Sequence, residues 1–206
     1  MYSQNEEEKV ILEYFTGKSG NFLDIGANDG ITLSNTRALA ELGWCGVFVE
    51  PSVQAFKKLK ENYEKQSRNK CHYFYNTALG NVNKKLVFYD SGEHLGKGDT
   101  GLLGTFHESE RVRFPKMKYT EVETQVYRWK TFFNRLSIKS FDFVSLDTEG
   151  NDRIILEQMD LDKLETKCIC VEWNLQEHLR TWFTGHLKKY GMKEVYKSAE
   201  NLIFVK

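Results

Sequence analysis

Three carboxylates stand close together after one apolar run of the sequence. Asp147, Glu149 and Asp152 follow the segment 141–146, which has the composition of a buried strand. A carboxylate at the end of such a strand can act as a general base, because it can accept the proton that a hydroxyl group loses as it reacts. We expect Asp147 to be this base, with Glu149 and Asp152 orienting it or the substrate. The alternative is structural, with Asp152 capping a helix and Glu149 making ordinary hydrogen bonds.

Two other kinds of chemistry fit the same region. His107 or His94, both in a glycine-rich stretch, is a rival base, although a loop histidine in solvent is the plainer interpretation of each. Closely placed acids could instead hold Mg²⁺, with Asp147, Glu149 and Glu172 as the conceivable ligands. The sequence does not favour a metal, because acidic oxygen ligands of this kind are common without ions.

A glycine-rich turn near the start of the chain forms the second candidate site. Gly26 and Gly30 follow a short apolar run, which is typical of a strand, a tight turn and a helix. The spacing G-x-x-x-G lacks the third glycine of a dinucleotide site and the lysine of a P-loop. The turn instead carries Asp24, Asn28 and Asp29, whose charge suits the sulfonium and ammonium groups of S-adenosylmethionine. A glycine turn without a ligand is the alternative.

Glu50 is the next informative residue. It closes the apolar segment 46–50 just before Pro51, where doubly wound folds place an acid that accepts both ribose hydroxyls of a nucleotide. The following segment, 71–75, ends at Asn76 and Thr77. In a doubly wound sheet its end lies beside that of the second strand, so these residues could approach an adenine edge. The alternative for Glu50 is an exposed acid at a strand end.

Composition limits the classes of protein that this chain can be. Its 206 residues predict one domain. Its 29 basic and 29 acidic residues give no net charge, which argues against a nucleic-acid partner. No apolar run approaches the roughly 18 residues of a membrane span, and the acidic start of the chain does not resemble a signal peptide. We therefore expect a cytoplasmic protein with no membrane partner.

The cysteines support the same expectation. Their spacing includes no C-x-x-C pair, and at this density a disulfide framework is not expected. The sequence therefore predicts reduced thiols on strands at four positions: Cys45, Cys71, Cys168 and Cys170.

The remaining elements are those of an alternating α/β chain. Residues 1–18 contain a predicted N-terminal helix over 7–15, and alternation predicts further strands over 84–90 and 119–127. The segment 92–118 has five glycines and no sustained period, so we predict a mobile substrate lid there. Its aromatic residues Phe106 and Phe114, with Tyr119, would suit the face of a sugar.

Apolar spacing predicts helices in the other connections. A helix expected after the glycine-rich turn places Leu42 on its buried side. A long helix over 175–190 places Leu175 in an apolar stripe. Shorter helices are expected over 130–136 and 151–159. Two short strands, 193–197 and 202–205, are expected to close the chain as an antiparallel pair.

Several motifs, in this order, resemble those of the FkbM-type methyltransferases over about residues 20 to 175. The motifs are Asp24-x-Gly26-Ala27-Asn28-Asp29-Gly30, Ser34-Asn35-Thr36, Gly43-Trp44-x-Gly46, Val49-Glu50-Pro51, Ala78-Leu79-Gly80, Ser145-Leu146-Asp147-Thr148-Glu149-Gly150 and Val171-Glu172. The resemblance implies a class I, Rossmann-like methyltransferase fold, a three-layer α/β sandwich. Its seven-stranded sheet would be mostly parallel, with one of the strands, near the C-terminus, antiparallel.

The resemblance also implies roles for residues. Asp24, Gly26 and Asn28, in the turn that Gly30 completes, would line the methionine part of S-adenosylmethionine. Glu50 would bind the ribose and residues 76–78 (Asn76, Thr77, Ala78) the adenine, and Asp147 would also contact the cofactor. Two positions depart from the commoner pattern. Asn151-Asp152 stands where many relatives have a small residue and Glu, and Ser145 stands where many have Lys.

The function that we expect is O-methylation of a hydroxyl on a sugar, a glycan or a related small molecule, with S-adenosylmethionine as cofactor. The alternatives are a Mg²⁺-assisted version of this reaction and a non-catalytic nucleoside-binding module. An NAD-dependent oxidoreductase is disfavoured by the missing third glycine. A nucleic-acid methyltransferase is disfavoured by the charge balance and by the lack of an Asn- or Asp-Pro-Pro-aromatic motif. The sequence does not fix the oligomeric state.

Overall fold

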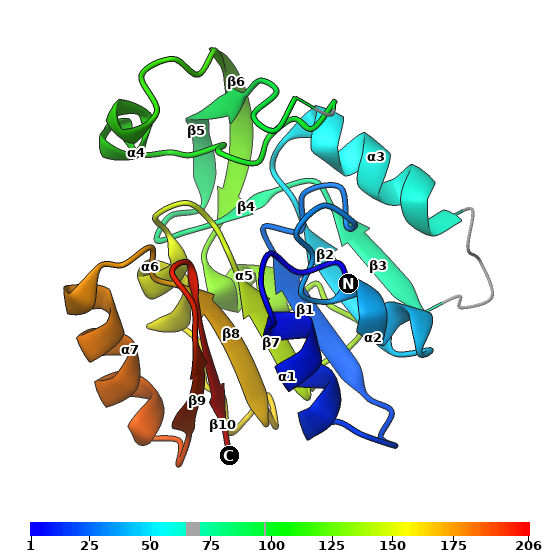
Figure 1. The fold of residues 1–206 in the computed structure, drawn as a ribbon. Helices are drawn as coiled ribbons and strands as arrows, with labels where there is room; N and C mark the ends of the chain where they lie inside the picture. The colour runs from blue at the N-terminus through cyan, green and yellow to red at the C-terminus, as the bar shows by residue number, and fades with distance from the viewer. Residues whose placement is uncertain (65–70, 97) are drawn as a thin grey trace.

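The computed structural model describes residues 1–64, 71–96 and 98–206. Within these ranges a seven-stranded sheet has the order β3-β2-β1-β7-β8-β10-β9 (Figure 1). Strands β3 to β8 of this order are parallel, and β10 is antiparallel to both β8 and β9. The predicted fold class is therefore confirmed. The strands are β1 (Asn21–Ile25), β2 (Cys45–Val49), β3 (His72–Tyr75), β7 (Phe143–Leu146), β8 (Cys168–Glu172), β9 (Lys193–Lys197) and β10 (Asn201–Val205).

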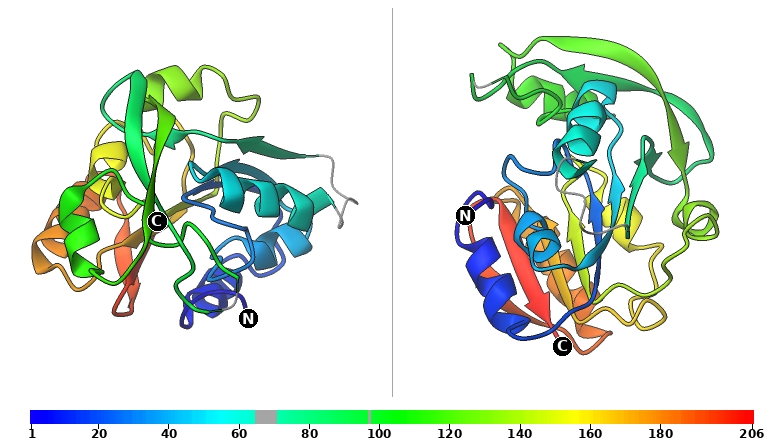
Figure 2. Two further views of the ribbon diagram at one scale, coloured as in Figure 1. Left: turned by 90° about the horizontal axis from the view of Figure 1, so that it is seen from above. Right: turned by 90° about the vertical axis from the view of Figure 1, so that its right-hand side faces the viewer.

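Helices cover both faces of the sheet, as Figures 1 and 2 show. Those on one face are α1 (Glu7–Tyr14), α2 (Arg37–Glu41) and α3 (Val53–Glu64). Those on the other are α5 (Trp129–Phe133), α6 (Asp152–Leu156) and α7 (Glu177–Lys188). Successive strand residues point to opposite faces. Phe22 therefore packs in the core on the side of α1, α2 and α3, and Leu23 packs in the core on the side of α5, α6 and α7. Apolar residues on both faces make the strands continuous hydrophobic runs.

A smaller sheet stands over the carboxyl ends of the main strands (Figures 1 and 2). Its order is β4-β6-β5, formed by β4 (Ala78–Leu79), β5 (Lys84–Ser91) and β6 (Tyr119–Tyr127). The segment 92–118, of which residue 97 lies outside the described residues, connects β5 to β6. It contains the short helix α4 (Glu108–Arg113), and its residue Thr105 forms an antiparallel bridge with Tyr89 of β5. Sequence periodicity missed α4 because six residues give fewer than two turns.

Two apolar residues lie elsewhere than predicted. Leu42 is 68% exposed because α2 ends at Glu41 and leaves it at the helix cap. Leu175 is 66% exposed because α7 begins only at Glu177. The other predicted helices and the closing antiparallel pair of strands are present. Within the described residues, no helix is both long and apolar enough to span a bilayer.

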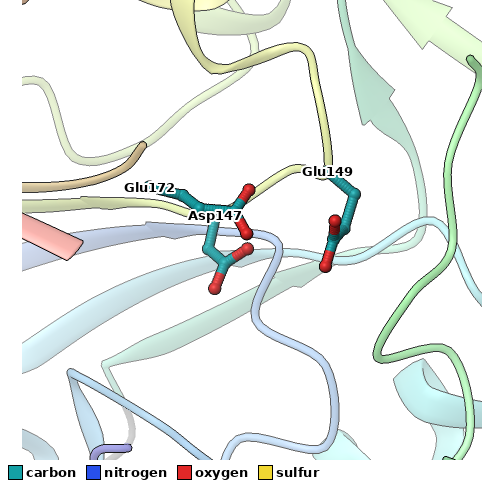
Figure 3. Close-up of side chains that lie close together, drawn as sticks. All are labelled: Asp147, Glu149 and Glu172. Atoms are coloured by element: carbon teal, nitrogen blue, oxygen red, sulfur yellow. The ribbon is translucent and has the colours of Figure 1, made fainter. Parts of the chain in front are cut away.

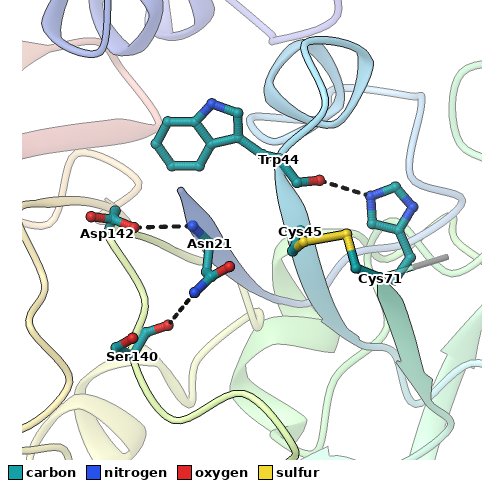
Figure 4. Close-up of a disulfide and its surroundings, with 7 residues drawn as sticks. Asn21, Trp44, Cys45, Cys71, Ser140 and Asp142 are labelled. Atoms are coloured by element: carbon teal, nitrogen blue, oxygen red, sulfur yellow. Dashed lines mark hydrogen bonds between the residues drawn. A yellow bond between two sulfur atoms is a disulfide. The ribbon is translucent and has the colours of Figure 1, made fainter. Parts of the chain in front are cut away.

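The prediction of four reduced thiols is wrong for Cys45 and Cys71, which form a disulfide (Figure 4). The parallel register places Gly46 opposite His72, so the residues just before them are neighbours. Their Cα atoms are 5.0 Å apart, within the range that a disulfide spans. Cysteine density could not reveal this pair, because the contact depends on which strands are adjacent. Cys168 and Cys170 are free and buried, as predicted.

Candidate functional site

A cavity of about 350 Å³ opens at the carboxyl ends of the central strands. Its walls come from the turn after β1, the end of β2, the residues after β3, the loops after β7 and β8, and the segment between β5 and β6. Of the residues predicted for the site, those that line it are Asp24, Gly26, Asn28, Glu50, Thr77, Ala78, Asp147 and Glu149. Gly30, Asn76, His107 and Asp152 do not line it.

The fold requires glycine at the two positions of the turn for different reasons. Gly26 has φ +88°, and a Cβ there would lie 1.6 Å from the backbone oxygen of Asp147. Only glycine lets β1 and β7 approach so closely at the cavity floor. Gly30 has φ +71°, and its Cβ would lie 2.5 Å from Leu59 and 2.6 Å from Tyr63. Gly30 therefore allows the turn to pack against α3, outside the cavity.

Polar contacts hold the turn in place. Asp24 is buried, and its Oδ2 accepts a hydrogen bond from Thr36 Oγ1 at 2.6 Å. Burial raises the pKa of Asp24 to about 6, and the Thr36 hydroxyl opposes the shift. Asn28 has φ +48°, and its side-chain amide donates to Thr100 O at 3.0 Å. This last contact joins the turn to the segment between β5 and β6.

Glu50 links the ends of β1 and β2. It is 3% exposed, and it accepts the backbone N–H of Asn28 at 2.8 Å and that of Ser52 at 2.7 Å. Burial raises the pKa of Glu50 to about 8, although both N–H groups act in the opposite direction. Each carboxylate oxygen uses one lone pair in these bonds, so each retains another for a ligand hydroxyl.

The residues after β3 have two roles: one supports the neighbouring backbone, and the others line the cavity. Asn76 is turned to the backbone, where its amide donates to Glu50 O at 2.8 Å and Pro51 O at 3.1 Å. Thr77 and Ala78 line the cavity, and the Thr77 hydroxyl donates to Gln125 O at 2.6 Å. Asn76 thus positions the chain beside Glu50, while its neighbours form the surface.

Three carboxyl groups meet on the other side of the cavity (Figure 3). One oxygen from each of Asp147, Glu149 and Glu172 lies within 4.8 Å of the others. Burial, then repulsion from Asp152 and Asp24, raises the pKa of Asp147 to about 7. Burial, then repulsion from Asp147, raises the pKa values of Glu149 and Glu172 well above their usual range. These three were the conceivable metal ligands, and the fold brings them together.

Asp152 has a different position. It is buried at the first residue of α6, and its Oδ1 accepts the backbone N–H of Thr148 at 3.1 Å. Burial raises its pKa to about 6. Its carboxylate thus closes the turn of residues 148–152, whereas the N-cap position of α6 belongs to Asn151 and not to Asp152, as the structural alternative had it.

A set of hydrogen bonds, here called the 105–107 clasp, joins the segment between β5 and β6 to this turn. Thr105 Oγ1 donates to Glu149 O at 2.8 Å and accepts the backbone N–H of His107 at 3.0 Å. His107 Nε2 and Asn151 Oδ1 are 3.0 Å apart. Glu149, with φ +48°, is held in a left-handed conformation between them. His107 is thus engaged with Asn151, whereas His94 lines the cavity.

Sequence reasoning missed several residues of the cavity wall. Phe106 and Phe114 line it as expected, but Tyr119 does not. Of the described residues that line it, Arg113 is the one permanent cation, and it forms an ion pair with Glu110. The wall residues without a signal in the sequence include Gln4, Phe88, Leu102, Leu103, Asn174 and Glu200.

The strand order, the antiparallel β10 and a cavity at the carboxyl ends define a class I methyltransferase fold. A ribosomal protein L11 methylase from Lactobacillus delbrueckii subsp. bulgaricus superposes with a TM-score of 0.55 and 10% identity, covering 98% of this chain and 77% of that one. Magnesium protoporphyrin IX methyltransferase from Synechocystis PCC 6803, solved with bound S-adenosylmethionine, gives 0.51 and 12%, covering 98% and 78%.

The model of the methyltransferase FkbM domain matches residues 24–193, and the chain belongs to this family. A methyltransferase FkbM from Methylobacillus flagellatus KT superposes with a TM-score of 0.57 and 9% identity over 91% of this chain. This chain spans 44% of the length of that protein. No curated protein matches the sequence. The protein is accordingly an S-adenosylmethionine-dependent methyltransferase, as the motifs predicted.

Proposed function

We propose that the protein transfers a methyl group to a hydroxyl of a neutral sugar, a glycan or a related small molecule. The observation that carries this proposal is Asp147, a carboxyl group in the cavity wall with a pKa raised to about 7. A base is most effective when its pKa lies near the working pH. An exposed aspartate, with a pKa near 4, would be a much weaker base toward an alcohol.

The residues divide the work as follows. When bound, S-adenosylmethionine would supply a methyl group activated by its sulfonium and would leave as the thioether S-adenosylhomocysteine. Asp147 accepts the hydroxyl proton, and Glu149 orients the acceptor. Asp24, Gly26 and Asn28 would hold the methionine part of the cofactor, Glu50 the ribose, and Thr77 and Ala78 the adenine. Alignment of the two reactants can contribute on the order of 7–11 kcal/mol.

The charge of the wall supports a neutral acceptor. Asp147, Glu149 and Glu172 face the space beside the cofactor, and Arg113 is already paired with Glu110. Among the described lining residues, this part of the wall therefore offers a phosphate or carboxylate acceptor no unpaired permanent cation as counter-charge, which argues against nucleic acid. Phe106 and Phe114 provide apolar surface on the segment above.

The test measures binding and turnover separately. Calorimetry with S-adenosylmethionine and S-adenosylhomocysteine establishes cofactor affinity, and a panel of sugar alcohols is screened for methyl transfer. Asp147→Asn should abolish transfer and change cofactor affinity less than about threefold, since it removes the base but keeps the side-chain shape. Asp160→Asn, at an exposed position, is the control. Retained turnover in Asp147→Asn would exclude this role.

A metal-assisted reaction is the second candidate, because the oxygens of Asp147, Glu149 and Glu172 converge. Mg²⁺ prefers oxygen ligands and would lower the pKa of a bound hydroxyl. Loss of activity in chelator, restored by Mg²⁺, would support this version. Indifference to chelator would remove it.

Cytoplasmic location and a single independent domain stay predictions. The Cys45–Cys71 disulfide counts against a cytoplasmic location, since disulfides are rare in the cytosol. Mass spectrometry of the protein alkylated directly in cells distinguishes the two redox states.

A further inference from the structure

The first residues of the chain form part of the cavity wall. Gln4 lines the cavity together with Ser34, Asn35 and Glu200. Figure 1 shows this stretch leading from α1 to the carboxyl end of the sheet, near the loop that follows β1. Neither the motifs nor the periodicity of the sequence assigned it any role in the site.

Hydrogen bonds fix residues 2–5 in this position. Ser3 forms a parallel bridge with Leu33 in the loop after β1. Asn5 Nδ2 donates to Glu200 Oε2 at 2.9 Å in the turn between β9 and β10. Glu7 is fully buried and accepts both the backbone N–H of Asn5 at 2.7 Å and the hydroxyl of Ser198 at 2.9 Å. The segment is therefore held between two loops that border the cavity.

The order of the strands indicates which end of the cofactor would meet this segment. Thr77 follows β3, Glu50 follows β2 and Asp24 lies one residue before the end of β1. A nucleoside with its adenine at Thr77 and its ribose at Glu50 directs its 5′ substituent across β1 toward β7 and β8. That direction leads toward the wall that Gln4 forms. The argument rests on the cofactor placement proposed above.

The methionine part of the cofactor carries an ammonium and a carboxylate group, which need opposite partners. Asn35 is 8% exposed, and its Oδ1 has no hydrogen-bond partner among the described residues. This oxygen can accept a hydrogen bond from the ammonium group. The carboxylate needs a donor in a wall that is rich in acids. Gln4 is exposed, lines the cavity, and uses its side-chain amide in no hydrogen bond within the described chain.

We infer that residues 2–5 belong to the cofactor site, where the Gln4 amide donates to the methionine carboxylate and Asn35 Oδ1 accepts from the ammonium. Asp24 and Glu50 are already engaged elsewhere: Asp24 accepts a hydrogen bond from Thr36, and Glu50 accepts the backbone N–H groups of Asn28 and Ser52 and is assigned to the ribose. Arg113 is engaged with Glu110. The N-terminal segment thus determines how tightly the amino-acid end of the ligand binds.

Two ligands that differ in this end test the inference by calorimetry. S-adenosylhomocysteine contains the amino acid, whereas 5′-methylthioadenosine has only the nucleoside and a methylthio group. Gln4→Ala should weaken S-adenosylhomocysteine about tenfold, as expected for one hydrogen bond to a charged group. Its affinity for 5′-methylthioadenosine should change less than about twofold. Gln4→Glu should weaken S-adenosylhomocysteine further, because it places a negative charge beside the carboxylate.

Matched controls separate this inference from the cofactor placement. Gln54→Ala removes an exposed glutamine that does not line the cavity, so both affinities should remain unchanged. Glu50→Ala should weaken both ligands, since both contain the ribose. If Glu50→Ala weakens both ligands but Gln4→Ala weakens neither, or weakens both equally, the role of Gln4 is excluded. If Glu50→Ala affects neither ligand, the cofactor placement itself is wrong and the inference is excluded with it.

Discussion

The two sides of the cavity are built in different ways. On the cofactor side, Asn28 and Glu50 are joined directly, 22 residues apart in the chain. On the side proposed for the acceptor, here called the acceptor side, Thr105 and Glu149 are joined 44 residues apart, through the segment that connects two strands of the smaller sheet. The first side is supported by adjacent central strands, and the second depends on the 105–107 clasp. The difference suggests that cofactor binding and acceptor positioning can be perturbed separately.

Gly26→Ala should have the largest effect on stability, because Gly26 lies where the two sides of the cavity meet. A Cβ there would lie 1.6 Å from Asp147 O, and the backbone has φ +88°. We expect a loss of more than about 4 kcal/mol in the free energy of unfolding or failure to fold, measured by urea denaturation. Gly185→Ala, in α7 with open space around it, should be neutral or stabilising by up to about 1 kcal/mol. Near-wild-type stability of Gly26→Ala would contradict the close approach.

Removal of the Cys45–Cys71 disulfide should destabilise the strands that carry the cofactor side, at the ends away from the cavity. The disulfide joins the start of β2 to the residue before β3, across a separation of 26 residues. Loop-closure entropy predicts a loss of about 3–4 kcal/mol in the free energy of unfolding for a Cys45→Ser, Cys71→Ser double variant. Denaturation with and without reductant measures the same difference in the wild type. A variant as stable as the oxidised wild type would show that the disulfide contributes nothing.

Thr105→Val tests whether the acceptor side can be loosened alone. Valine keeps the shape but leaves Glu149 O and the His107 N–H without their partner. We expect a loss of about 1–3 kcal/mol and faster hydrogen exchange in residues 148–151. Affinity for S-adenosylhomocysteine should change less than about twofold, and Thr105→Ser should behave as wild type because it keeps the hydroxyl. Equal losses of cofactor affinity and loop protection would mean that the two sides are coupled.

A pH dependence of stability compares one buried acid from each side of the cavity. The pKa of Glu50 is raised from 4.5 to about 8 and that of Asp147 from 3.8 to about 7. Because these carboxyls are more easily protonated in the folded state, their contribution to stability is full below the unfolded pKa and is lost as pH rises through the folded one. Unfolding free energy of the ligand-free protein should therefore fall between about pH 4 and pH 8.

Glu50→Gln and Asp147→Asn should each reduce this fall by at least about 1 kcal/mol, since one pKa unit corresponds to about 1.4 kcal/mol. The Glu50 contribution should extend to higher pH than that of Asp147. Urea denaturation at pH 5, 6.5 and 8 measures both. Variants with the same pH profile as the wild type would exclude the raised pKa values.

The cofactor side could be predicted from the sequence because its determinants are local. The turn glycines, Asp24 and Glu50 all follow apolar runs, and a strand end fixes where its next residue lies. The seven-stranded, mostly parallel sheet with one antiparallel strand came from the resemblance, and the structure confirms it. Even here, local patterns could not distinguish Gly26, which lines the cavity, from Gly30, which packs on α3.

The rest depended on contacts between distant segments. The disulfide follows from the adjacency of β2 and β3, and the clasp follows from the folding of the segment after β5 over the main sheet. Gln4 lies in an acidic stretch without apolar periodicity, so nothing local marked it as part of a cavity. Leu42 and Leu175 were misplaced because periodicity does not show where a helix ends.

The carboxyl cluster also affects how charge is conserved in the proposed reaction. Methylation of a neutral hydroxyl replaces a sulfonium cation and an alcohol by a thioether, an ether and one proton. Asp147, Glu149 and Glu172, with raised pKa values, can retain that proton beside the place where the sulfonium stood. Total charge inside the cavity is then the same before and after transfer. Only when the proton escapes to solvent does the wall regain the negative charge that attracts the next cationic cofactor.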